Sequence, residues 1–232
     1  MSDHAPAPAG ASPFLQGHYR SMGEQLDAAK LGLWLFLASE VLFFGGLFVA
    51  YAVFRANHPD LFHYAHHFLD WRMGGLNTLV LITSSLTAAW AVRSAQLGKQ
   101  AELRRMLLST LLLASCFLVV KYFEYSHKLH SGIFWGAAYA PTEEAIRAAV
   151  PEAVRALPVP AHMGIFFSIY FLMTGLHGIH VLIGMGLYLW LYRRAGRGEF
   201  GPGYFVPVDG VALYWHLVDL IWIFLFPLFY LL

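Results

Sequence analysis

The sequence has little charge and almost no cysteine. Only 12% of its 232 residues are charged, whereas 58% are hydrophobic and 16% aromatic, which excludes an ordinary soluble domain. A net charge of +1 without clustered Lys and Arg excludes a nucleic-acid-binding surface. The single cysteine, Cys116, cannot form an internal disulfide, and its apolar surroundings predict a small core residue.

Common catalytic signatures are missing as well. No G-x-S-x-G, H-E-x-x-H or G-x-x-x-x-G-K motif occurs, so the usual hydrolase, zinc-protease and nucleotide-binding sites have no support. The first 30 residues lack an apolar core, so we expect no cleavable signal peptide. Their Ala, Pro and Gly content predicts a flexible polar tail over 1–27.

Long apolar runs dominate the rest of the chain. A hydrocarbon core about 30 Å thick takes roughly 20 helical residues to cross, and five runs approach this length. We predict an all-α integral membrane protein, a bundle of five transmembrane helices in one membrane domain, 28–232. The expected spans are about 31–54, 76–97, 103–125, 162–192 and 208–232.

The second span is the weakest of the five, because it is short and polar, and an interfacial or buried helix is its alternative. Its hydroxyl and amide side chains should bond a neighbouring helix or the preceding helical turn. They are Asn77, Thr78, Thr83, Ser84, Ser85 and Thr87.

The connections between the spans predict the orientation in the membrane. The tail, second and fourth connections hold nine Lys and Arg residues, and the opposite side holds five. The positive-inside rule then puts the amino terminus in the cytoplasm and the carboxyl terminus outside. In the long external connection, 130–160, Thr142 can cap a short surface helix that has two acids in its first turn.

Glu40 lies near the middle of the first span, where a carboxylate costs about 2.5 to 3.5 kcal/mol or more. It could belong to a proton path, bond a polar group on a partner helix, or be neutral. A relay needs a chain of further ionisable groups, and the first span has none. We therefore favour a structural or lipid-facing role.

Two further polar sets lie on helix faces. Lys121, Glu124 and Lys128 fall within about 60° of one another, which favours an ion-pair ladder whose lysine stems reach the membrane interface, over a lipid headgroup site. His162, His177 and His180 share a similar arc. A second helix with paired histidines is lacking, so neither haem ligation nor a zinc site is favoured. We expect no metal site, and histidines that bond between helices.

Five segments in order are characteristic: ASEVLFFGGLFVAY, LNTLVLITSSLTAAWA, KYFEYSHKLHSGIF, YFLMTGLHGIHVLIGMGLYL and YWHLVDLIWIFLFPLFYLL. Together they resemble subunit III of the haem-copper cytochrome oxidases over about residues 28 to 232. The resemblance implies a bacterial cell-membrane subunit without haem or copper, which packs against catalytic subunit I of an oxygen-reducing, proton-pumping complex. Haem and copper are then expected in partner subunits. Besides subunit I, the expected partners are subunit II, further small subunits of the complex and membrane lipids.

The resemblance also implies roles for single residues. Glu40 matches a buried carboxylate that reacts with carbodiimide but does not carry the pumped protons. Glu124 and His127 match the family's E-Y-x-H, and Lys30 and Trp34 match positions that border bound phospholipid. Four further positions should tie the fourth and fifth helices together: His177, His180, His216 and Asp219.

Many family members have seven spans, with two more helices at the amino terminus that form a lipid-filled cleft. Five spans leave open whether that cleft is filled. The expected function is that of a subunit without its own active site, which stabilises subunit I and supports its proton uptake in a cytochrome c oxidase. A quinol oxidase subunit and an independent transporter are the alternatives. Small residues should allow close packing among the helices and against subunit I: Gly45, Gly46, Gly175, Gly178, Gly184 and Gly186.

Overall fold

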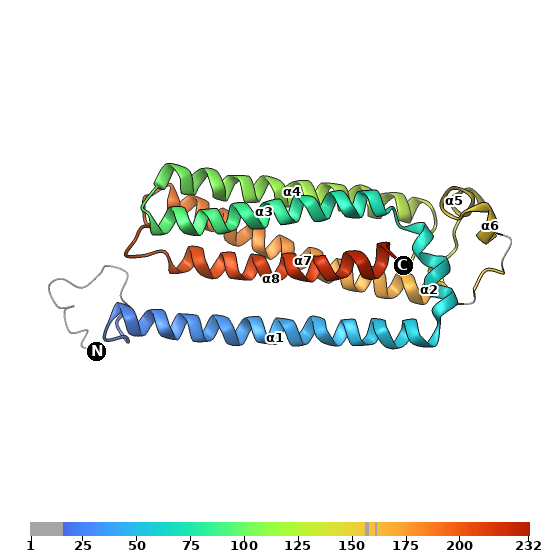
Figure 1. Ribbon diagram of the computed structural model, residues 1–232, viewed down its shortest axis with the longest axis horizontal. Coiled ribbons are helices and arrows are strands. Elements are labelled where there is room, and N and C mark those ends of the chain that lie inside the picture. The colour runs from blue at the N-terminus through green and yellow to red at the C-terminus, as the bar shows by residue number, and fades with distance from the viewer. Residues whose placement is uncertain (1–15, 156–157, 161) are drawn as a thin grey trace, which may run out of the picture.

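Long helices run from end to end of the computed structural model (Figure 1). The structure describes residues 16–155, 158–160 and 162–232, and five of its helices are long. They are α1 (Met22–Asn57), α3 (Trp71–Gln96), α4 (Gln100–His130), α7 (Gly164–Ala195) and α8 (Val206–Tyr230). Each is long and apolar enough to span a membrane, so the predicted all-α, five-helix membrane fold is confirmed. Helices α1 and α4 extend past the expected spans at both ends, and the other three differ from them by a few residues. Residues 22–27 of the predicted polar tail are helical, and residues 1–15 lie outside the described part.

Local capping explains where several helices begin. At α1 the Ser21 hydroxyl accepts a hydrogen bond from the backbone N–H of Glu24, 3.2 Å away, and the Glu24 carboxylate accepts one from the N–H of Arg20 at 2.9 Å. The first bond satisfies an N–H of the first helical turn, and the second fixes the residue that precedes the cap. Asp70 caps α3 in a similar way, through the N–H of Arg72 at 2.8 Å.

Short elements gather at one end of the bundle, on the side predicted to be external (Figure 1). They are α2 (Pro59–Ala65), η1 (His66–Phe68), η2 (Gly136–Ala138), α5 (Glu143–Ala149) and α6 (Glu152–Arg155). The predicted surface helix is confirmed as two pieces. Thr142 caps α5 by accepting from the N–H of Ala145 at 3.2 Å, and Pro151 separates α5 from α6, because a residue before proline avoids the helical conformation.

The core lies between α3, α4, α7 and α8, which pack as a closed ring in which each helix packs mainly against two of the others. Helix α8 is the most buried of the five. Two glycines allow close approach: a Cβ at Gly184 would lie 2.6 Å from the ring of Trp215, and one at Gly74 would lie 2.8 Å from Phe226. Gly184 is the one member of the predicted glycine set in such a contact.

The other five glycines of that set have open space where a side chain would be. The expectation that they pack against other helices of this chain is therefore wrong, because they lie on faces that α3, α4 and α8 do not cover. Their contact with a partner subunit stays a prediction. Cys116 is also exposed rather than in the core, since its side of α4 faces away from the bundle.

Helix α3 satisfies most of its polar side chains, as predicted for the second span. The indole N–H groups of Trp215 and Trp222 donate to Ser84 at 2.9 Å and to Thr78 at 3.1 Å. The hydroxyls of Thr87 and Thr110 on α4 lie 2.7 Å apart. Asn77 differs, because it is fully buried and its amide has no partner within the described part of the chain.

Helix α1 stands apart from this ring (Figure 1). It packs along α8, and its membrane-crossing stretch is the least buried of the five. The polar contacts that fasten it include Glu40 with His180 on α7, and the Tyr51 hydroxyl, which donates to the backbone carbonyl of Leu228 on α8.

Candidate functional site

The most connected polar site among the described residues surrounds Glu124 of α4, inside the helix bundle. Its two oxygens accept from Lys121 and Lys128 of the same helix, each at 2.9 Å. One oxygen also accepts from the hydroxyls of Tyr170 on α7, at 2.7 Å, and Tyr230 on α8, at 2.6 Å. We call these five residues the Glu124 cluster. It joins three of the four core helices.

The predicted ion-pair ladder is confirmed, but the predicted position of its lysines is wrong. The side chains of Lys121 and Lys128 are 9% and 4% exposed, so they point into the bundle rather than to the membrane interface. This face of α4 packs against α7, and the ammonium of Lys121 reaches Tyr230 at 2.7 Å and lies 4.7 Å from the ring centroid of Trp222. The cluster holds two cationic side chains and one carboxylate.

A second site joins α1 to α7. The Glu40 carboxylate lies 3.0 Å from Nε2 of His180, and Nδ1 of that ring lies 2.7 Å from the carbonyl oxygen of Leu176. Both side chains are mostly buried, 18% and 15% exposed. They line a cavity of about 490 Å³ together with Tyr214 of α8, whose hydroxyl donates to the His180 carbonyl at 2.9 Å. Of the open alternatives for Glu40, the structure shows a polar partner on another helix.

The histidine stripe is shorter than predicted. His162 lies before α7 with a φ of 65°, so only His177 and His180 are on the helix. The ring of His177 packs between Phe117 of α4 and Trp222 of α8, and its nitrogens have no hydrogen-bond partner among the described residues. It therefore contacts α8 by ring packing.

His216 and Asp219 of α8 lie on its α3 side. Nδ1 of His216 is 2.6 Å from the hydroxyl of Ser85 on α3, and Asp219, buried in the same seam, has one carboxylate oxygen without a partner among the described side chains. The expectation that these two residues tie α8 to α7 is wrong, because their side of α8 faces α3. The sequence predicted that Ser85 bonds a neighbouring helix, but it could not identify His216 as the partner.

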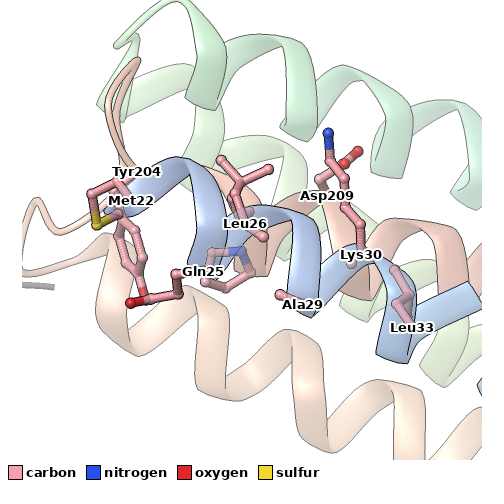
Figure 2. Close-up of a pocket in the computed structure, with 11 residues that line it drawn as sticks. Met22, Gln25, Leu26, Ala29, Lys30, Leu33, Tyr204 and Asp209 are labelled. Atoms are coloured by element: carbon pink, nitrogen blue, oxygen red, sulfur yellow. The ribbon is translucent and has the colours of Figure 1, made fainter. Parts of the chain in front are cut away.

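Three other predicted residues lie at the surface. His127 is exposed, away from the Glu124 carboxylate. Lys30 lines a pocket between α1 and the start of α8, where it extends to the same side as Asp209 (Figure 2). Trp34, 60% exposed, lines a separate apolar groove of about 620 Å³ between the same helices. An aromatic side chain in an apolar groove and a lysine near a helix end suit the boundary between acyl chains and headgroups.

Three histidines form a further cluster outside the five long helices, in α2 and η1. The ring centroids of His63, His66 and His67 lie 4.0 to 6.2 Å apart. Burial lowers the pKa of both His66 and His67, and the charge of a neighbouring histidine lowers it further. The residues that the structure describes include no group of three or more His, Cys, Asp or Glu placed to hold a metal ion.

Sequence reasoning missed the partners of the charged residues. Tyr170, Tyr230 and Trp222 complete the surroundings of Lys121 and Glu124, yet each occurs in an aromatic-rich helix where it reads as ordinary core. A hydroxyl or indole N–H that is buried usually has a hydrogen-bond partner. The polar groups of these aromatic residues were therefore a chemical signal in the sequence. Only the crossing of α4, α7 and α8 determines which of the many aromatic residues lie beside Lys121 and Glu124.

Comparison with known proteins identifies the family. Residues 13–142 and 156–232 match the family described as cytochrome c oxidase subunit III. Cytochrome c oxidase subunit 3 of Corynebacterium diphtheriae is 31% identical over 207 residues, 88% of each chain. The subunit 3 of Loxodonta africana is 30% identical over 217 residues, 91% of this chain and 71% of the relative.

A third relative is longer. The heme-copper oxidase subunit I+III of Aeropyrum pernix is 29% identical over 213 residues, which are 88% of this chain and 23% of that protein. The family match covers nearly all described residues, including every helix that carries the Glu124 cluster and the Glu40–His180 pair. The chain therefore belongs to the cytochrome c oxidase subunit III family of the haem-copper oxidases.

Proposed function

We propose that this chain is the subunit III of a proton-pumping aerobic cytochrome c oxidase, and that it packs directly against catalytic subunit I. The observation that carries the proposal is the relative named subunit I+III, in which the region matching this chain is part of one longer polypeptide. Two units joined in one chain have a high effective concentration for each other, which suits a stable contact. Subunit II and further small subunits would complete the complex.

In this proposal the chain has no active site of its own, and haem and copper are bound by the partner subunits. Its contribution is to stabilise subunit I and to support proton uptake there. Within the Glu124 cluster, and within the Glu40–His180 pair, the polar groups bond to each other, which suits a scaffold. Exposed apolar and glycine-containing faces on α1 and α7 supply surface on which a partner helix can pack closely.

The proposed setting is a bacterial inner membrane, with the amino terminus in the cytoplasm and the carboxyl terminus outside. The excess of Lys and Arg at the α3–α4 and α7–α8 connections supports this orientation. Phospholipid is the proposed occupant of the pocket at Lys30 and of the groove at Trp34, since both combine apolar lining with a position between α1 and α8.

The test is purification of the tagged chain from its native membrane in mild detergent. The co-purifying chains are identified by mass spectrometry, and a reduced-minus-oxidised spectrum is recorded. Haem a bands together with a copper-bearing subunit II would support the proposal. Haem b or o with a copper-free subunit II would indicate a quinol oxidase instead, and a colourless protein without partners would contradict an oxidase role.

A further inference from the structure

The Glu40–His180 contact has a geometry that limits how many protons it can hold. Nδ1 of His180 faces the carbonyl oxygen of Leu176 at 2.7 Å, and a carbonyl can only accept a hydrogen bond, so Nδ1 carries a hydrogen. The other ring nitrogen, Nε2, faces a Glu40 oxygen at 3.0 Å. Both of these atoms are acceptors unless a proton lies between them.

We infer that Glu40 and His180 share one proton, and that the pair is an electrically neutral latch that holds α1 on α7. The pair is either an imidazolium beside a carboxylate or an imidazole beside a carboxylic acid, and its net charge is zero in both forms. Without the proton, a carboxylate would face a nitrogen lone pair. With a second one, two donors would face each other.

The surroundings favour the neutral form over either alternative. The pair lines an apolar cavity, and the other titratable group in its lining is Tyr214, whose hydroxyl is already used on the His180 carbonyl. The ring of Phe44 on α1 packs edge-on to His180, with centroids 5.1 Å apart. A net charge on the buried pair would cost free energy, and the described lining of the cavity holds no other ion to offset it.

The same geometry makes the pair a poor proton conductor. On the far side of the imidazole the next atom is the Leu176 carbonyl, which already belongs to the backbone of α7. A proton that reached His180 from Glu40 would have no onward acceptor among the groups that line this cavity. His180 thus acts as a positioning residue for Glu40, and the role of the pair is attachment of α1.

The first test is infrared spectroscopy of the full chain in lipid nanodiscs. The bands of Glu40 are identified as those lost in Glu40→Gln, and the bands of His180 as those lost in His180→Phe. We expect these bands to show one proton between the two side chains, either as a carboxylate with an imidazolium or as a carboxylic acid with a neutral imidazole. A carboxylate with a neutral imidazole, or a carboxylic acid with an imidazolium, would overturn the inference.

The second test measures the attachment of α1 with spin labels at exposed positions, Leu42 on α1 and Leu189 on α7. Glu40→Gln keeps an N–H donor for Nε2 of His180, so the distance distribution should match that of the unchanged protein. Glu40→Leu removes the link and should broaden the distribution, while the neighbouring exposed variant Ser39→Ala should not. If Glu40→Leu behaves like Ser39→Ala, the latch is refuted. Should Glu40→Leu fail to accumulate, the infrared spectrum of the unchanged chain still decides whether the pair holds one proton.

Discussion

Replacing Glu124 by alanine is the most severe single change that the structure predicts. The variant removes the only carboxylate of the Glu124 cluster and leaves the two lysines, 9% and 4% exposed, without a counter-charge. It also removes the acceptor for two tyrosine hydroxyls. Removing one partner of a buried ion pair typically costs about 3 to 5 kcal/mol.

The expected cost translates into a measurable change of melting temperature. A domain of this size loses about 2 to 4 °C per kcal/mol, so Glu124→Ala should melt about 6 to 20 °C below the unchanged protein. Thermal unfolding in detergent can be followed by the intrinsic fluorescence of the seven tryptophans. Glu143→Ala is the matched control, because its side chain is 89% exposed in a weak pair with Arg147, which is worth about 0 to 1 kcal/mol.

A triple variant tests the reason for this cost. In Lys121→Met, Glu124→Leu, Lys128→Met all three charges are replaced by apolar side chains of similar size, so no uncompensated charge remains. Such replacements are often neutral or stabilising, and the melting temperature should recover most of the loss seen in Glu124→Ala. If the triple variant melts as low as Glu124→Ala, or if Glu124→Ala melts like the Glu143→Ala control, the electrostatic reasoning is wrong.

Three other predictions concern separate parts of the molecule. Glu40→Gln should leave oxidase turnover and the proton-to-electron ratio of the complex intact, and loss of pumping in a normally assembled complex would contradict a structural role. Gly184→Leu should destabilise the chain by about 1 to 3 kcal/mol through overpacking against Trp215. Gly178 has open space around it, so Gly178→Leu should leave the melting temperature of the isolated chain unchanged and weaken only its association with partner chains. The turn after α7 should loosen in acid, because hydrogen bonds from Arg194 and Arg197 lower the pKa of Glu199 below its ordinary value of 4.5. The stabilisation of the turn by Glu199 is complete above that value and is lost as the pH falls through the lowered pKa. Hydrogen exchange should show this loss in the unchanged protein but not in Glu199→Gln.

Periodicity and apolar length were enough to predict the fold. The spans, the short helix capped by Thr142 and the hydroxyl bonding of α3 all depend on local sequence, and the structure confirms them. The orientation of Lys121 and Lys128 was not predictable in the same way. A lysine near a helix end can extend to the interface or turn inward, and the choice depends on whether neighbouring helices supply a buried acceptor, as α7 and α8 do through their tyrosines.

The sequence also failed to predict which neighbouring helix some polar residues contact, for the same physical reason. His216 and Asp219 occupy a face of α8 that could meet either neighbouring helix, and the crossing with α3 decides it. Glycine positions carried even less information, because a glycine allows close approach without requiring it. The link between Glu40 and His180 joins residues 140 positions apart, and a single chain offers no local signal for such a pair.

The lengths of the helices have a consequence for the membrane in which the protein can reside. Helix α1 has 36 residues and α7 has 32, so at 1.5 Å per residue they measure about 54 and 48 Å, against a hydrocarbon core of about 30 Å. Both helices therefore project into the headgroup layers even when tilted. A bilayer several ångströms thicker would still meet helical backbone with all its internal hydrogen bonds made, so moderate hydrophobic mismatch should be met by tilt and immersion rather than by breaking secondary structure.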